Sequence, residues 1–229
     1  MLNRGDIYER YIFKELLDSN LTKLQYSPAG ADKTKPDTKF LVNGKAYNLE
    51  IKLDLNVDFG QGTLRYNFNE FKWEVFSENQ EMQSILEYFS IDEYANSVWK
   101  KIPNRVGKDD IGRDPKPISK LSSSELSEDR KNFQSKFKRI SGKNPIAQYY
   151  NSKDTYYIQI GGKFKNGFYY MGSDPANLGV PEFKPTETQI RIRNKNGRFT
   201  TALILRAGTI QTSDYDIEKS VNFILNAGR

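Results

Sequence analysis

The sequence predicts an α/β (α+β) chain with an N-terminal helix, a central sheet, a basic helical insertion and a β-rich C-terminal portion, because the spacing of its hydrophobic residues changes twice. Residues 3–19 repeat apolar side chains at helical spacing, residues 39–54 alternate apolar and polar side chains around a turn, and the last third is rich in β-branched and aromatic residues. With 229 residues, 37% of them hydrophobic and 13% aromatic, the chain can form one well-packed domain. We therefore expect a single domain over residues 1–229.

Three segments are expected within that domain. A core at about 5–100 is followed by a basic helical insertion at about 104–145 and by a β-hairpin-rich portion at about 150–229.

The first predicted element is an amphipathic helix from Asn3 to about Ser19. Asn3 has a side chain that is typical of a helix N-cap. Glu9 lies at the edge of the apolar stripe. The apolar positions that recur at helical spacing are Ile7, Tyr8, Tyr11, Ile12, Leu16 and Leu17.

A hairpin is predicted after a loop at 26–37 that is rich in turn-forming residues. Strands at Lys39–Val42 and Lys45–Asp54 flank Asn43-Gly44, a pair that readily takes the positive φ angles of a type I′ turn. Such a hairpin folds the start of the first strand back toward the end of the second.

Two helices are predicted after a further loop at 57–62. Ser77 and Ser90 each precede a Gln or Glu by three positions, which is the spacing of a capping box. We expect helices at about 77–89 and 91–101.

The stretch Asn104–Pro145 is the most basic part of the chain. It contains 11 Lys and Arg against 6 Asp and Glu, and therefore holds most of the net charge of +6. Its first part resembles a loop, and Ser124–Arg139 predicts a basic helix with Leu126, Phe133 and Phe137 on one face.

The last third predicts short strands separated by tight turns, and a closing helix at about 213–225. The turn pairs are Gly161-Gly162, Asn166-Gly167 and Asn196-Gly197. The expected strands are 156–160, 168–171, 189–193 and 198–205.

The absence of His and Cys narrows the possible chemistry. The chain has no thiolate nucleophile, no Cys-based zinc site and no imidazole base. Catalysis must then use carboxylates, Lys, Tyr, Ser/Thr or a hard metal ion, of which magnesium is the default. The net charge of +6 and the pI of about 9.2 favour a polyanionic partner.

No window approaches the roughly 18 to 20 apolar residues of a membrane-spanning helix. The first residues also lack the apolar stretch of a signal peptide. We expect a soluble, cytoplasmic protein.

One group of polar residues has the composition expected of a catalytic site. In residues 46–54 the side chains of Glu50 and Lys52 point to the same side of an alternating strand. The predicted hairpin returns Asp37 toward them, so two carboxylates and one ammonium group converge.

Hydrolysis of a phosphodiester needs a cation that stabilises charge on the phosphate and acidifies the attacking water. Asp37 and Glu50, with the backbone carbonyl of Ile51, offer the oxygen ligands that Mg²⁺ prefers. Lys52 would hold the water, help to deprotonate it or stabilise the transition state.

These residues resemble the PD-(D/E)xK nuclease superfamily, with Pro36-Asp37, twelve intervening residues and then Glu50-Ile51-Lys52. The resemblance covers about residues 5–62, where Glu9 resembles the superfamily's frequent helix Glu near the metal site. It implies a restriction-endonuclease-like mixed sheet flanked by helices. It also implies magnesium-dependent cleavage of phosphodiesters with Asp37, Glu50 and Lys52 as catalytic residues.

The triplet by itself is not specific, because the chain contains six Asp/Glu-x-Lys triplets. Only Glu50-Lys52 lies on an alternating strand that follows a hairpin signal, a Pro-Asp pair and a helix. The alternatives are a solvated strand face with a cross-strand ion pair for Glu50 and Lys52, a simple turn role for Asp37 with Asp32 as rival carboxylate, and a surface position for Glu9.

A set of residues in the basic stretch and in the last third is expected to contact DNA. The alternatives are a solvated basic face for the first group and a charge-protected sheet edge for the second. The residues are Arg105, Lys108, Arg113, Lys116, Gln189, Arg191, Arg193 and Arg198.

Together these features predict a type II restriction endonuclease that cleaves double-stranded DNA at a specific palindromic site, with Mg²⁺ as cofactor and as a homodimer. A structure-specific nuclease of repair or recombination, such as a junction resolvase, is the alternative within the fold. A basic DNA-binding protein without catalysis is the alternative outside it.

Overall fold

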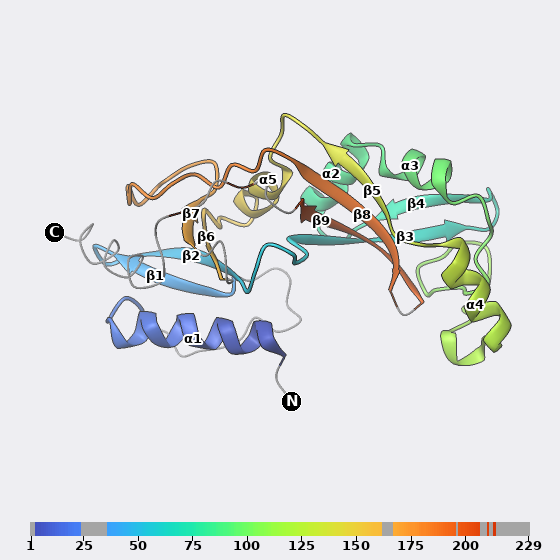
Figure 1. Ribbon diagram of the computed structural model, residues 1–229, viewed down its shortest axis with the longest axis horizontal. Helices are drawn as coiled ribbons and strands as arrows, with labels where there is room; N and C mark the ends of the chain where they lie inside the picture. Colours follow the sequence, from blue (N-terminus) through green and yellow to red (C-terminus); the bar gives the residue numbers. More distant parts are fainter. Residues whose placement is uncertain are drawn as a thin grey trace. The chain divides into compact units, whose positions relative to one another are not determined.

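The computed structural model describes residues 3–23, 36–161, 167–195, 197–206, 210 and 213. Within these residues it contains five α-helices and two β-sheets, so the predicted α+β class is confirmed (Figure 1). The strands form two sheets, not one. The closing helix expected at about 213–225 lies outside the described residues, apart from Ser213. Asp32 and one residue of each turn pair predicted in the last third also lie outside them.

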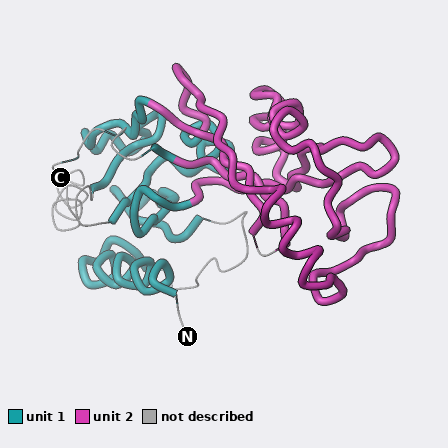
Figure 2. The backbone as a smooth tube through the Cα atoms, turned by 45° about the vertical axis from the view of Figure 1, so that its right-hand side comes forward, with its two compact units in different colours: residues 1–57, 146–186, 205–229 teal, residues 58–145, 187–204 magenta. Residues whose placement is uncertain are grey.

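The chain divides into two compact units (Figure 2). The first unit comprises residues 1–57, 146–186 and 205–229, and the second comprises 58–145 and 187–204. Each unit contains segments from distant parts of the sequence, so the predicted core at about 5–100 is divided between them.

The first unit is built on a four-stranded mixed sheet. The strand order is β1 (Thr38–Val42), β2 (Lys45–Lys52), β6 (Tyr157–Ile160) and β7 (Gly167–Tyr170). β2 and β6 are parallel, and the two outer pairs are antiparallel.

Helix α1 (Arg4–Asp18) packs on this sheet (Figure 1). Asn3 caps it as predicted, because its side chain accepts a hydrogen bond from the backbone N–H of Asp6. Ile12 and Leu16 join the sheet residues in one hydrophobic cluster. The predicted apolar stripe is only partly correct, since Ile7, Tyr11 and Leu17 are exposed.

The hairpin of β1 and β2 has the predicted two-residue turn. Val42 pairs with Lys45, and both turn residues have positive φ angles, 50° at Asn43 and 77° at Gly44. The register also pairs Thr38 with Leu49, so Asp37 lies level with Glu50.

The second unit is built on a five-stranded sheet. The strand order is β4 (Lys72–Phe76), β3 (Gly60–Asn67), β9 (Arg198–Leu205), β8 (Thr188–Lys195) and β5 (Lys136–Ile140). Helices α2 (Gln80–Tyr88) and α3 (Ile91–Val98) pack against its strands. Trp73, Trp99, Phe133 and Phe199 form an edge-to-face aromatic core, with ring centroids 4.6 to 5.8 Å apart.

Two helix predictions in this unit need correction at their ends. Helix α2 begins at Gln80 because Asn79, not Ser77, accepts the capping hydrogen bond. Helix α3 ends at Val98, and its N-cap residue Ser90 makes no side-chain cap bond.

The basic helix predicted at Ser124–Arg139 is wrong in its second half. Helix α4 (Ser123–Asn132) follows a short 3-10 turn at Ile118–Lys120, and Lys136–Ile140 forms strand β5 instead. The reason is tertiary, because β5 pairs antiparallel with β8, a partner that lies about fifty residues away in the sequence.

We expect Gly44→Val to destabilise the hairpin by about 1–2 kcal/mol, because a β-branched side chain is strained at a φ of 77°. Gly44→Asn is the matched control, since Asn tolerates this conformation. Thermal unfolding measures both. A wild-type melting temperature for Gly44→Val would show that the turn does not constrain the strands.

Candidate active site

The structure brings Asp37, Glu50 and Lys52 together at the end of strand β2. The Nζ atom of Lys52 forms an ion pair with Oε1 of Glu50 and lies 3.9 Å from Oδ2 of Asp37. The backbone N–H of Ile51 donates a 2.7 Å hydrogen bond to the same Asp37 oxygen. The short β1–β2 turn therefore produces the convergence that the spacing predicted.

The three charged side chains are largely removed from solvent. Only 13% of the Asp37 side chain, 10% of Glu50 and 18% of Lys52 is exposed. On the neighbouring strand, Ile158 and Ile160 are in register with Glu50 and Lys52 and are fully buried. A solvated strand face is therefore the wrong description of this pair. Burial of charged groups is costly, and such groups are frequent at functional sites.

Burial and the charges of neighbouring side chains together set the pKa values in the cluster. Burial and the nearby charge of Glu50 raise the pKa of Asp37 to about 7. Burial acts to lower the pKa of Lys52, but the charges of Glu50 and Asp37 outweigh it and raise that pKa. Lys52 is thus held as a cation, which suits binding of a water or phosphate oxygen better than removal of a proton.

Tyr150 on helix α5 (Pro145–Asn151) is a site residue that the sequence analysis missed. Its hydroxyl donates a 2.9 Å hydrogen bond to Oε1 of Glu50, the oxygen that also contacts Lys52. Burial, followed by the charge of Glu50, raises the pKa of Tyr150 well above its usual value, so it stays a donor. A tyrosine about one hundred positions from its partner gives no local signal in the sequence.

Glu9 lies near the cluster of Asp37, Glu50 and Lys52 but is not one of its three central residues. It is half-buried on α1, and burial raises its pKa while Lys52 opposes the shift. Tyr8, next to Glu9, accepts a 3.3 Å hydrogen bond from Nε2 of Gln159 on β6. This contact ties the helix to the sheet at the level of the site.

The donor set fits a hard divalent cation. Asp37 and Glu50 supply carboxylate oxygens, and strand geometry directs the Ile51 carbonyl to the same edge as the Ile51 N–H that contacts Asp37. Among the residues that the structure describes, no three Asp or Glu side chains form a metal-binding group. A magnesium ion here would therefore complete its shell with water, as this ion usually does.

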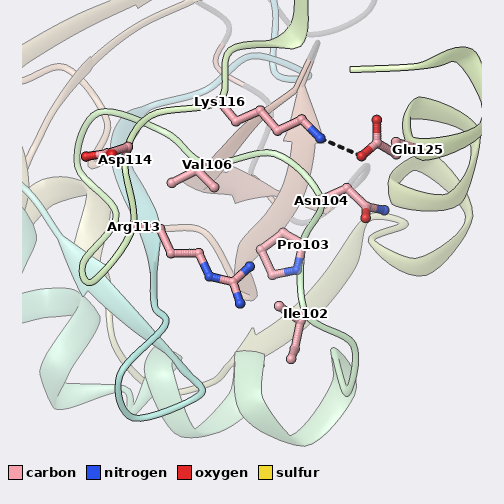
Figure 3. Close-up of a pocket in the computed structure, with 8 residues that line it drawn as sticks. All are labelled: Ile102, Pro103, Asn104, Val106, Arg113, Asp114, Lys116 and Glu125. Atoms are coloured by element: carbon pink, nitrogen blue, oxygen red, sulfur yellow. Dashed lines mark hydrogen bonds and ion pairs between the residues drawn. The ribbon is translucent and has the colours of Figure 1, made fainter. Parts of the chain in front are cut away.

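The predicted DNA contacts in the basic stretch lie in the second unit and differ in their surroundings. Lys108 is exposed, whereas Arg105 is partly buried, lies over the Phe199 ring and has a pKa that burial lowers. Arg113 and Lys116 line a cavity of about 540 Å³, in which Lys116 points to Glu125 and forms an ion pair with it (Figure 3). None of the three cluster residues lines this cavity.

The predicted contacts in the last third lie on strands β8 and β9. Gln189, Arg191 and Arg193 alternate with the buried Ile190 and Ile192, as predicted. Arg198, the first residue of β9, is exposed.

Comparison with known proteins adds little to this geometry. No protein-family model matches the chain, and no curated protein matches its sequence. Among solved structures, a chain described as HhaI endonuclease in complex with DNA matches with 13% identity, 99% coverage of both chains and a TM-score of 0.40. In the described part of the chain, no helix combines the length and apolar character needed to cross a membrane.

Two substitutions in the cluster should change stability in opposite directions. Lys52→Met removes the cation that two buried carboxylates share, and we expect it to lower the free energy of unfolding by about 3 kcal/mol. Asp37→Asn relieves the repulsion from Glu50 and keeps an acceptor for the Ile51 N–H, so we expect a gain of about 1 kcal/mol.

Thermal unfolding in EDTA measures both effects. A loss of stability in Asp37→Asn as large as that in Lys52→Met would contradict the description of the cluster as rich in negative charge.

Proposed function

We propose that this protein is a magnesium-dependent endodeoxyribonuclease of the type II restriction class, which hydrolyses phosphodiester bonds in double-stranded DNA at a specific palindromic site. The observation that carries the proposal is the buried convergence of Asp37, Glu50 and Lys52 at the end of strand β2. Without His or Cys in the chain, this cluster is the best-formed candidate for hydrolytic chemistry among the described residues.

In this mechanism Asp37, Glu50 and the Ile51 carbonyl would hold a magnesium ion. When bound, the ion supplies the charge that polarises the phosphate and acidifies water. Lys52, which stays protonated, holds a phosphate or water oxygen and stabilises charge that develops in the transition state. Ile158 and Ile160 are fully buried beside Glu50 and Lys52 on the neighbouring strand, and such apolar surroundings strengthen electrostatic interactions.

Tyr150 acts as a positioning residue in the same mechanism. Its hydrogen bond occupies one lone pair of Glu50 Oε1 and fixes the orientation of the carboxylate. Glu9 adds a further negative charge near Lys52, and we assign it to water positioning.

The substrate class follows from charge and from symmetry. A net charge of +6 favours the phosphate backbone of DNA. Cleavage of both strands at a palindrome needs two copies of the cluster in twofold symmetry, so we propose a homodimer.

The central test is incubation of the purified protein with phage DNA, in magnesium or in EDTA. We expect discrete fragments in magnesium only. Lys52→Ala and Asp37→Ala should lower the cleavage rate by at least about a thousandfold, whereas Glu78→Gln, an exposed substitution in the other unit, should cleave normally.

Each other outcome has a distinct meaning. Full cleavage by either alanine variant would refute the active-site assignment. Intact linear DNA with cleaved branched DNA would indicate a junction resolvase, and salt-dependent binding without cleavage of any DNA would indicate a DNA-binding protein.

The role of Tyr150 can be tested separately with Tyr150→Phe. We expect kcat to fall about tenfold while the Kd for DNA is unchanged. The lost hydrogen bond orients the Glu50 carboxylate, and the Tyr150 hydroxyl has no role in DNA binding in this mechanism. Tyr149→Phe is the matched control, since the Tyr149 hydroxyl accepts from Lys153 instead. Equal kcat values for the two variants would remove Tyr150 from the mechanism.

A further inference from the structure

One face of the five-stranded sheet in the second unit carries polar and charged side chains together with the exposed Phe137. Strand alternation directs Leu64, Phe199 and Ile190 into the core of the unit, and the intervening residues to the opposite face. We call this opposite side the arginine face. Its side chains include Gln61, Arg65, Phe137, Arg139, Gln189, Arg191, Arg193 and Arg198.

At the arginine face a single carboxylate is shared by two arginines. Asp58, two residues before β3, accepts through one oxygen from Nη2 of Arg191 and through the other from Nη2 of Arg193, the latter at 2.7 Å. Gln61 adds a 2.7 Å hydrogen bond from its side-chain amide to the second oxygen. The three charged side chains are 13 to 19% exposed.

This arrangement leaves both guanidinium groups incompletely bonded. The Nε atoms of Arg191 and Arg193 are buried and have no hydrogen-bond partner among the described residues. A guanidinium group binds an oxyanion best through two parallel N–H donors, but one carboxylate shared by two arginines offers each of them a single oxygen. The cluster also keeps one positive charge in excess, because two cations face one anion.

We propose that Asp58 is a latch that occupies the place of a DNA phosphate, and that the phosphate backbone of duplex DNA displaces it from Arg191 and Arg193. Each phosphate has two non-bridging oxygens, so it can bind a guanidinium group through both of its donors. The charge of the face suits this ligand: Arg198 is exposed, and the Arg139 side chain remains 65% exposed beside its ion-pair partner Glu187, 3.7 Å away, so both extend the positive surface beyond Asp58. The proposal shares the DNA substrate of the proposed function but needs no catalysis.

The latch has a consequence for affinity. In the free protein Asp58 competes with DNA, so every contact that DNA gains with Arg191 or Arg193 is offset by one that Asp58 loses. Removal of the carboxylate should therefore tighten DNA binding and increase its dependence on salt, since the negative charge of Asp58 then no longer offsets one of the two positive charges that meet the phosphates.

The test measures the binding of a fluorescein-labelled duplex by anisotropy, in EDTA and at two salt concentrations. Asp58→Asn should lower Kd about tenfold and steepen the salt dependence by about one unit of slope. Glu78→Gln, which removes the same charge from an exposed position, should stay within about twofold of wild type.

A double-mutant cycle separates the latch from a general charge effect. In an Arg191→Gln/Arg193→Gln background, Asp58→Asn should leave Kd unchanged, because its effect passes through these two arginines. An equal gain in that background would overturn the latch, and so would a folded Asp58→Asn protein with wild-type affinity.

A second measurement keeps the proposal testable if Asp58→Asn does not fold. Arg191→Gln/Arg193→Gln, with Asp58 intact, should weaken DNA binding by about tenfold more than Lys184→Gln, a change at an exposed lysine. Equal losses would overturn the arginine face as the contact surface.

The two proposals fail in different ways. Normal cleavage with no effect of Asp58→Asn on affinity refutes the latch alone. Tighter binding by Asp58→Asn in a protein that cleaves no DNA refutes the nuclease alone.

Discussion

The register of one hairpin is the constraint on which the candidate site depends. Because side chains alternate along a strand, a slip of one residue between β1 and β2 would turn Glu50 and Lys52 toward α1 and move Leu49 and Ile51 out of the core. The two-residue turn at Asn43-Gly44 prevents this slip, since its positive φ angles fit the pairing of Val42 with Lys45. The same register places Asp37 level with Glu50.

Each unit contains one buried cluster in which the positive and negative charges are unequal in number. The excess charge is negative in the first unit and positive in the second. In the first unit two buried carboxylates share the single cation of Lys52, and this excess of negative charge suits a divalent metal ion. In the second unit two arginines share the single carboxylate of Asp58, and this excess of positive charge suits a phosphate. Buried charges are normally matched, and these two unmatched clusters are the observations on which the two binding proposals rest.

The sequence predicted those parts of the fold that depend on local interactions. The cap and extent of α1, the hairpin and the shared face of Glu50 and Lys52 follow from residues within a few positions of one another. Other predictions were wrong where contacts between segments distant in the sequence determine the secondary structure. Residues 136–140 have a spacing compatible with a helix, but they gain backbone hydrogen bonds by pairing with β8 and form a strand. The division of the strands between two sheets depends on the same kind of distant pairing.

The sequence by itself therefore determined which residues approach one another at the candidate site, because a tight turn and strand alternation are short-range properties. Only the tertiary structure decided how that site is buried and supported. The parallel pairing of β2 with β6 sets Ile158 and Ile160 beside the charges, and α5 brings Tyr150 to Glu50. It also decided that Arg191 and Arg193 meet Asp58 from 133 and 135 positions away. Such contacts depend on the path of the whole chain, which no local pattern of residues encodes.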